Sequence, residues 1–78
     1  MKASIRIGRH ARRRMAERGI CESEVHAVLA APDLTRPGNK PGRRVYERKL
    51  SRITCVVTVD GTDPIEIITA FCRDEGEA

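Results

Sequence analysis

The chain has 78 residues, of which 40% are hydrophobic and 33% charged, and its formal net charge is +4. This length predicts one domain with a modest core, and because Tyr46 and Phe71 are the only aromatic residues, that core must be aliphatic. Three cysteines without a CxxC or zinc-type spacing argue against a disulfide-stapled secreted module. No apolar run approaches the ~18 residues of a membrane span, so we expect a cytoplasmic protein with free thiols and no membrane partner.

The charge is distributed unevenly along the chain. Residues 1–18 contain seven basic residues and one acidic residue, whereas the remaining sixty contain eight basic and ten acidic residues. A cationic end is typical of proteins that bind a polyanion such as RNA or DNA. The alternative is that the protein is merely rich in arginine and that this helix face is solvated and binds no polyanion.

The N-terminal half of the chain is predicted to be helical. Residues 3–7 alternate and form either a short strand or an extended lead-in. An apolar stripe at helical spacing predicts a first helix from Gly8 or Arg9, and Gly19 suits the position just after its last residue. The stripe follows Ile7, Ala11, Met15 and Arg18 at spacings of four, four and three.

A second helix is predicted directly after the first. Cys21 stands at its N-cap, and Glu24 three residues later supplies the other half of a capping box. A thiol accepts hydrogen bonds weakly, so this cap is expected to be poorer than a serine cap. Pro32 ends the helix, because the residue before a proline is disfavoured in the helical conformation.

The C-terminal half is predicted to be a sheet. Residues 33–42 contain two Pro-Gly steps and form a long loop, in which residues 34–36 fit a brief edge strand. Three strands follow at 43–50, 53–59 and 65–72, and the short connections between them make neighbouring strands antiparallel. Strict alternation in the last strand places Ile65, Ile67, Thr69 and Phe71 on one face and Glu66, Ile68, Ala70 and Cys72 on the other.

This order of elements predicts an α+β fold in which two N-terminal helices pack on a three- to four-stranded antiparallel sheet. A single domain is expected over residues 1–78, with a helical half at 8–32, the loop at 33–42 and the sheet at 43–73. A core this small has a thin stability margin, so a homodimer or another complex is a reasonable expectation.

A histidine–arginine cluster on the first predicted helix gives the clearest indication of function. His10, Arg14 and Arg18 lie along the edge of the apolar stripe. Arginines at that edge either line a cleft or clamp carboxylates and carbonyl groups, since an unpaired buried charge costs several kcal/mol. His10 is either a general acid/base or a residue that caps or packs the helix start. The outward-pointing residues are Arg9, Arg12 and Arg13.

A second basic group is expected on the sheet. Arg44, Tyr46 and Arg48 share one face of the strand at 43–50, and Arg73 ends the last strand. If this face meets the first helix at a cleft, the side chains suffice to cleave RNA without a metal. A base would remove the 2′-OH proton while guanidinium groups hold the phosphate. The alternative is an ordinary strand with exposed arginines and one packed tyrosine.

Other chemistries find no motif in the sequence. It contains no glycine-rich phosphate loop, no Ser/His/Asp or Cys/His ordering typical of a nucleophile, and no carboxylate cluster that suits Mg²⁺. The two histidines, His10 and His26, do not make a metal site. We therefore expect neither a metal nor a cofactor.

The string HARRRMAERGI at residues 10–20, followed by Glu24-Val25 and Pro32, resembles the N-terminal half of the DUF4258 family. The pattern of that family runs roughly HA-xx-RM-xx-RGI-S-xx-EV and then a proline; Cys21 stands here in place of the serine. Tyr46 and the two apolar strands after it fit the rest. The resemblance implies a distant relation to the RelE/ParE and BrnT toxin superfamily. Members of that superfamily pack helices against an antiparallel sheet, and several are ribonucleases held by cognate antitoxins.

Cluster and resemblance together predict a toxin–antitoxin-type domain that acts as an RNA-cleaving or ribosome-directed ribonuclease. Its partners would be RNA or the ribosome, and a cognate antitoxin or a second copy of the chain. The catalytic candidates are His10, Arg14, Arg18 and Tyr46, and the nucleic-acid-binding candidates are Arg9, Arg13, Arg44, Arg48 and Arg73. One alternative is a non-catalytic module that binds nucleic acid or an acidic protein. Another is a structural protein whose arginines are internal clamps.

Overall fold

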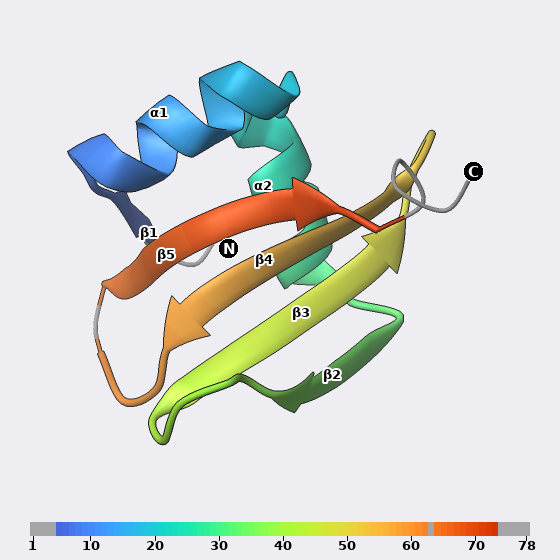
Figure 1. The fold of residues 1–78 in the computed structure, drawn as a ribbon. Helices are drawn as coiled ribbons and strands as arrows, with labels where there is room; N and C mark the ends of the chain where they lie inside the picture. Colours follow the sequence, from blue (N-terminus) through green and yellow to red (C-terminus); the bar gives the residue numbers. More distant parts are fainter. Residues whose placement is uncertain (1–4, 63, 74–78) are drawn as a thin grey trace.

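The computed structural model describes residues 5–62 and 64–73, which form an α+β fold with two helices on one face of a sheet (Figure 1). The elements are β1 (Ile5–Ile7), α1 (Arg9–Arg18), α2 (Glu22–Ala30), β2 (Leu34–Pro37), β3 (Arg43–Lys49), β4 (Ile53–Val59) and β5 (Ile65–Cys72). In the sheet the strands follow the order β1-β5-β4-β3-β2. Helix α1 lies over β5, and α2 lies over β4 and β3. The second face of the sheet carries no helix of the described chain.

The sheet has five strands and is mixed, which corrects the expectation of three to four antiparallel strands. Strands β2, β3, β4 and β5 are antiparallel neighbours, as their short connections predict. Strand β1 instead runs parallel to β5, with Ile5 opposite Ile65 and Ile7 opposite Ile67. These partners come from opposite ends of the sequence, so local spacing cannot predict their pairing. Of the expected strand or lead-in at 3–7, residues 3 and 4 lie outside the described residues.

The end of α1 and the start of α2 have the geometry that the sequence predicts. After α1, Gly19 adopts the left-handed conformation with φ 68°, and the Ile20 N–H donates to the Met15 carbonyl over 2.9 Å. At the start of α2, the N–H of Cys21 donates to the Glu24 carboxylate over 2.9 Å, which is one half of the predicted capping box. The connection between the helices is thereby fixed, and both apolar faces turn toward the sheet.

The core lies between the helices and the sheet and is aliphatic, because the chain has almost no aromatic residues. Completely buried valines from α2 and β4 form its centre, and each contributes roughly 1.5–3 kcal/mol by leaving water. Its buried residues are Ile7, Ala11, Met15, Ile20, Val25, Val28, Val56, Ile67 and Ala70. The predicted stripe of the first helix is therefore confirmed for Ile7, Ala11 and Met15, whereas Arg18 is only part-buried and lies outside this core.

A β-bulge between β4 and β5 changes which residues of β5 face the core. Val57 pairs with Thr69, but the next residue, Thr58, pairs with Ile67, so Ile68 is an extra residue on β5. As a result, Ile67 and Ala70 both belong to the core, although strict alternation places them on opposite faces. The predicted alternation over 65–72 is wrong for this reason.

Two negative expectations concern cysteines and membranes. All three cysteines are free thiols, as expected; Cys55 is buried and Cys21 is exposed. Neither described helix has the length and apolar character needed to cross a bilayer.

Candidate nucleic-acid interface

The outer face of α1 carries a row of exposed arginines. Ala11 and Met15 turn the inner face of the helix into the core, so the residues between them point to solvent. The exposed arginines of this helix are Arg9, Arg12, Arg13 and Arg14. Arg14 was expected to border the core, but its side chain is 44% exposed. The helix thus presents a cationic surface that is broader than the sequence indicates.

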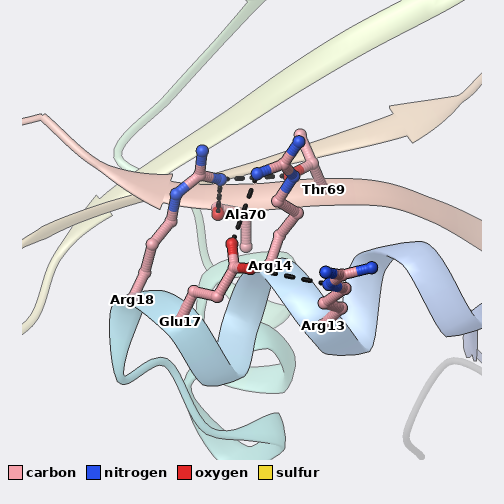
Figure 2. Close-up of polar contacts among 6 residues, drawn as sticks. All are labelled: Arg13, Arg14, Glu17, Arg18, Thr69 and Ala70. Carbon is pink, nitrogen blue, oxygen red and sulfur yellow. Dashed lines mark hydrogen bonds and ion pairs between the residues drawn. The ribbon is translucent and has the colours of Figure 1, made fainter.

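Most of these arginines have only exposed ion-pair partners. Glu17 lies 3.6 Å from Arg13 Nε and 3.2 Å from Arg14 Nη1 (Figure 2). Arg12 lies 3.7 Å from Glu22, and Arg9 has no ion pair or hydrogen bond within the described residues. Exposed pairs of this kind contribute about 0–1 kcal/mol and exchange readily for other anions. The guanidinium groups therefore remain available to a ligand.

Arg18, the last residue of α1, is held by the sheet. Its Nη1 donates to the Thr69 hydroxyl over 3.2 Å and to the Ala70 carbonyl over 2.9 Å (Figure 2). Strand β1 pairs with β5 only as far as Ile67, so the Ala70 carbonyl lies at an edge that has no strand partner in the described chain. Arg18 satisfies this carbonyl and ties α1 to β5, which is the clamp role that the sequence left open.

His10 lies at the outer side of the first turn of α1. Its side chain is exposed and makes no hydrogen bond or ion pair in the part of the chain that the structure describes. Arg13 and Arg14 follow it at the i+3 and i+4 positions, so they are its neighbours on the helix surface. An imidazole in this position can exchange a proton with a bound ligand without first breaking a contact.

The sheet-side group shares one face of β3, as predicted, but α2 covers that face. Tyr46 is half-buried against the core, and Arg48 donates to the Ala27 carbonyl of α2 over 2.8 Å. Arg44 pairs with Asp60 over 3.2 Å. No hydrogen bond or ion pair among the described residues joins His10 to this group. The structure therefore places Tyr46 and Arg48 beneath α2 and His10 at the outer start of α1.

Arg73 lies with a buried carboxylate on the open face of the sheet. Its Nη1 is 2.6 Å from Glu47 Oε2, and Arg36 Nη2 is 3.7 Å from Glu47 Oε1. The Glu47 side chain is only 6% exposed, so this carboxylate is held between two arginines away from bulk water. The Cys55 thiol points at the same carboxylate over 3.5 Å. Burial, reinforced by the negative charge of Glu47, raises the pKa of Cys55 from 9.0 to about 11, so the thiol stays neutral and unreactive.

One feature of the open face was not expected from the sequence, namely a hollow of about 320 Å³ that is lined in part by Arg36, a partner of Glu47. Basic side chains from the predicted loop and the start of β3 surround the hollow, namely Arg36, Lys40 and Arg43. The available signal was three cations within residues 36–43, but the Pro-Gly steps made this segment look like a connection only.

A further feature of the fold is how the candidate metal ligands lie relative to one another in space. Within 5–62 and 64–73, no three His, Cys, Asp or Glu side chains converge closely enough to hold an ion.

The comparison with protein families gives a match over nearly the whole chain. The model of DUF4258, a domain of unknown function, matches residues 7–76, which include both helices and strands β2 to β5. No curated protein and no solved structure matches the chain. The resemblance noted in the HARRRMAERGI string is thus confirmed at the family level, and the chain belongs to the DUF4258 family.

Proposed function

We propose that this domain binds RNA through the outer face of α1. The observation that supports it is that some arginines are bonded to the protein and others are exposed to solvent. Arg18 and Arg48 are occupied in holding the helices to the sheet, whereas Arg9 and Arg13 point to solvent. Guanidinium groups bind phosphate oxygens in a bidentate manner, so a row of them suits a phosphate backbone.

The helix start strengthens the attraction for anions. No acidic residue lies in the first turn of α1, and its N-cap, Gly8, has no side chain that could occupy the free N–H groups. The positive end of the helix dipole and Arg9 therefore act in the same direction. The resemblance to a toxin superfamily that includes ribonucleases favours RNA over other polyanions.

Binding to a labelled single-stranded RNA, followed by fluorescence anisotropy at low salt, tests this proposal. The variant Arg9→Gln/Arg13→Gln removes two phosphate contacts and should weaken binding about tenfold. The matched control Arg44→Gln/Lys49→Gln removes the same charge from β3 and should weaken binding less than about threefold. Equal losses in the two variants would show that only net charge matters and would reject α1 as the interface.

A second candidate function is RNA cleavage by a toxin-type ribonuclease, with a cognate antitoxin as partner. It is favoured by the exposed imidazole of His10, which has no partner among the described residues and lies beside Arg13 and Arg14. In this proposal His10 removes the 2′-OH proton as the 2′-oxygen attacks phosphorus, and Arg14 holds the phosphate. The bond from phosphorus to the 5′-oxygen breaks, leaving a cyclic phosphate, and the His10 imidazolium or water gives a proton to the departing 5′-oxygen. Arg18 and Tyr46 act by positioning α1 and the core rather than by contact with RNA.

Induced expression and RNA integrity distinguish cleavage from binding alone. The ribonuclease proposal predicts growth arrest and cleaved RNA with the unaltered chain, and loss of both in His10→Gln with RNA affinity retained. Intact RNA and normal growth, together with salt-sensitive binding, would reject cleavage and leave the binding module.

A further inference from the structure

The hollow on the open face of the sheet lies opposite α1 and α2, and its walls differ in character. Its floor is apolar and its rim is basic, and no acidic side chain is among the described residues that line it. A volume of about 320 Å³ is at the lower end of the range for small-molecule sites. The floor consists of Val45, Val57, Ile68 and Phe71, and the rim of Arg36, Lys40 and Arg43.

The rim carries positive charge that the described protein does not balance. The side chains of Lys40 and Arg43 have no ion pair or hydrogen bond within the described residues. Arg36 is 3.7 Å from Glu47, whose charge is already neutralised by Arg73 at 2.6 Å. A ligand with at least two negative charges therefore complements this rim.

A tight hairpin fixes the backbone from which Lys40 and Arg43 extend. The N–H of Gly38 donates to the Arg43 carbonyl over 2.9 Å, and the Arg43 N–H donates to the Lys40 carbonyl over 3.2 Å. A Cβ at Gly38 would lie 2.6 Å from Arg43 Cβ, so only glycine allows this approach. The backbone that carries the two cations is thus fixed at one end of the hollow, so binding does not have to order this loop.

The β-bulge completes the floor. As the extra residue of β5, Ile68 lines the hollow together with Thr69 and Phe71, although strict alternation would turn it toward the helices. The half-buried ring of Phe71 adds an aromatic surface beside the aliphatic side chains. Such a floor suits a flat, apolar ring, since base–aromatic stacking contributes about 1–3 kcal/mol.

We propose that this hollow binds a nucleoside monophosphate. The base lies against Val57 and Phe71, and the phosphate lies between Lys40 and Arg43. Two cations at one end favour a dianionic phosphate over a single carboxylate. Because the hollow and α1 are on opposite sides of the sheet, this proposal does not depend on RNA binding by α1.

Isothermal titration of the full chain with adenosine monophosphate tests the proposal, with adenosine and inorganic phosphate as the two half-ligands. The monophosphate should bind at least about tenfold more tightly than either half, since both parts of the site are then occupied. Equal affinity for inorganic phosphate would reduce the hollow to a plain anion site, and absence of monophosphate binding would reject it altogether.

Variants assign the two ends of the ligand. Lys40→Gln/Arg43→Gln should weaken the monophosphate at least about tenfold and leave adenosine unchanged, because it removes only the phosphate contacts. Phe71→Leu should weaken the monophosphate and adenosine by the same factor. Lys49→Gln, at the far end of β3, is the control and should change neither. An equal loss in this control would overturn the assignment, and circular dichroism of each variant verifies that it is folded.

Discussion

Two clusters of this domain have the same composition, one glutamate between two arginines, and differ in burial. They are the α1 cluster, Arg13, Arg14 and Glu17, and the sheet cluster, Arg36, Glu47 and Arg73. The side chain of Glu17 is 48% exposed, whereas that of Glu47 is 6% exposed. The shortest contact is 3.2 Å in the α1 cluster and 2.6 Å in the sheet cluster.

This difference shows how burial assigns different roles to the same residue types. Water screens the α1 cluster, so its pairs add little stability and its arginines stay open to a ligand. In the sheet cluster, removal of an arginine leaves the buried charge of Glu47 less compensated, and removal of Glu47 leaves a cavity on the open face of the sheet. We therefore expect substitutions in the sheet cluster to affect folding and substitutions in the α1 cluster to affect binding.

The largest effect is expected from Glu47→Ala. Loss of the buried carboxylate removes its charge-assisted bonds to Arg36 and Arg73 and leaves a cavity, while the two half-exposed arginines can be hydrated, so the free energy of unfolding should fall by about 2–3 kcal/mol. The matched control Glu17→Ala should lower it by less than about 0.5 kcal/mol. Urea denaturation measures both, and similar losses would contradict the role assigned to burial.

The second effect concerns the arginines that join helices to the sheet. Arg48→Met keeps much of the packing volume but removes the 2.8 Å bond to the Ala27 carbonyl, so we expect a loss of about 2 kcal/mol. Arg9→Met, on the outer face of α1, should change stability by less than about 0.5 kcal/mol. Thermal and urea unfolding measure the loss of stability in each variant. Equal losses in Arg48→Met and Arg9→Met would show that Arg48 does not hold α2 to the sheet.

The third effect is a pH dependence at Cys55, beside the sheet cluster, and it is small near neutral pH. Its thiol has a pKa of about 11 in the folded chain against an ordinary value of 9.0. Because the folded state retains the proton longer, this thiol contributes stability that is complete below pH 9 and is lost as the pH rises toward 11. Stability measured across this range should fall more steeply in the unaltered chain than in Cys55→Ala. Equal slopes would show that the thiol is not held in its neutral form.

The sequence predicts the local elements well, because each depends on nearby residues. Gly19 ends α1 as expected, and strands β4 and β5 have the predicted limits. The parallel pairing of β1 and the extra residue Ile68 were not predictable from spacing, since both depend on partners that are distant in the sequence.

The candidate site was predictable only in part, for a related reason. Helical periodicity correctly turns Arg9, Arg12 and Arg13 outward, but it cannot say that Arg18 reaches the free edge of β5. Glu47 is buried because of the register of β3 against β2 and β4, and the spacing of residues along the chain does not predict that register.

The salt dependence of RNA affinity tests most directly the claim that the α1 arginines are free for binding. For single strands, each phosphate contact contributes about 0.7 to the slope of log affinity against log salt concentration. We predict that Arg9→Gln/Arg13→Gln lowers the magnitude of this slope by about 1.4, whereas Arg44→Gln/Lys49→Gln leaves it unchanged. The same slope in the α1 variant and the unaltered chain would mean that these arginines do not contact phosphate, and would contradict the account.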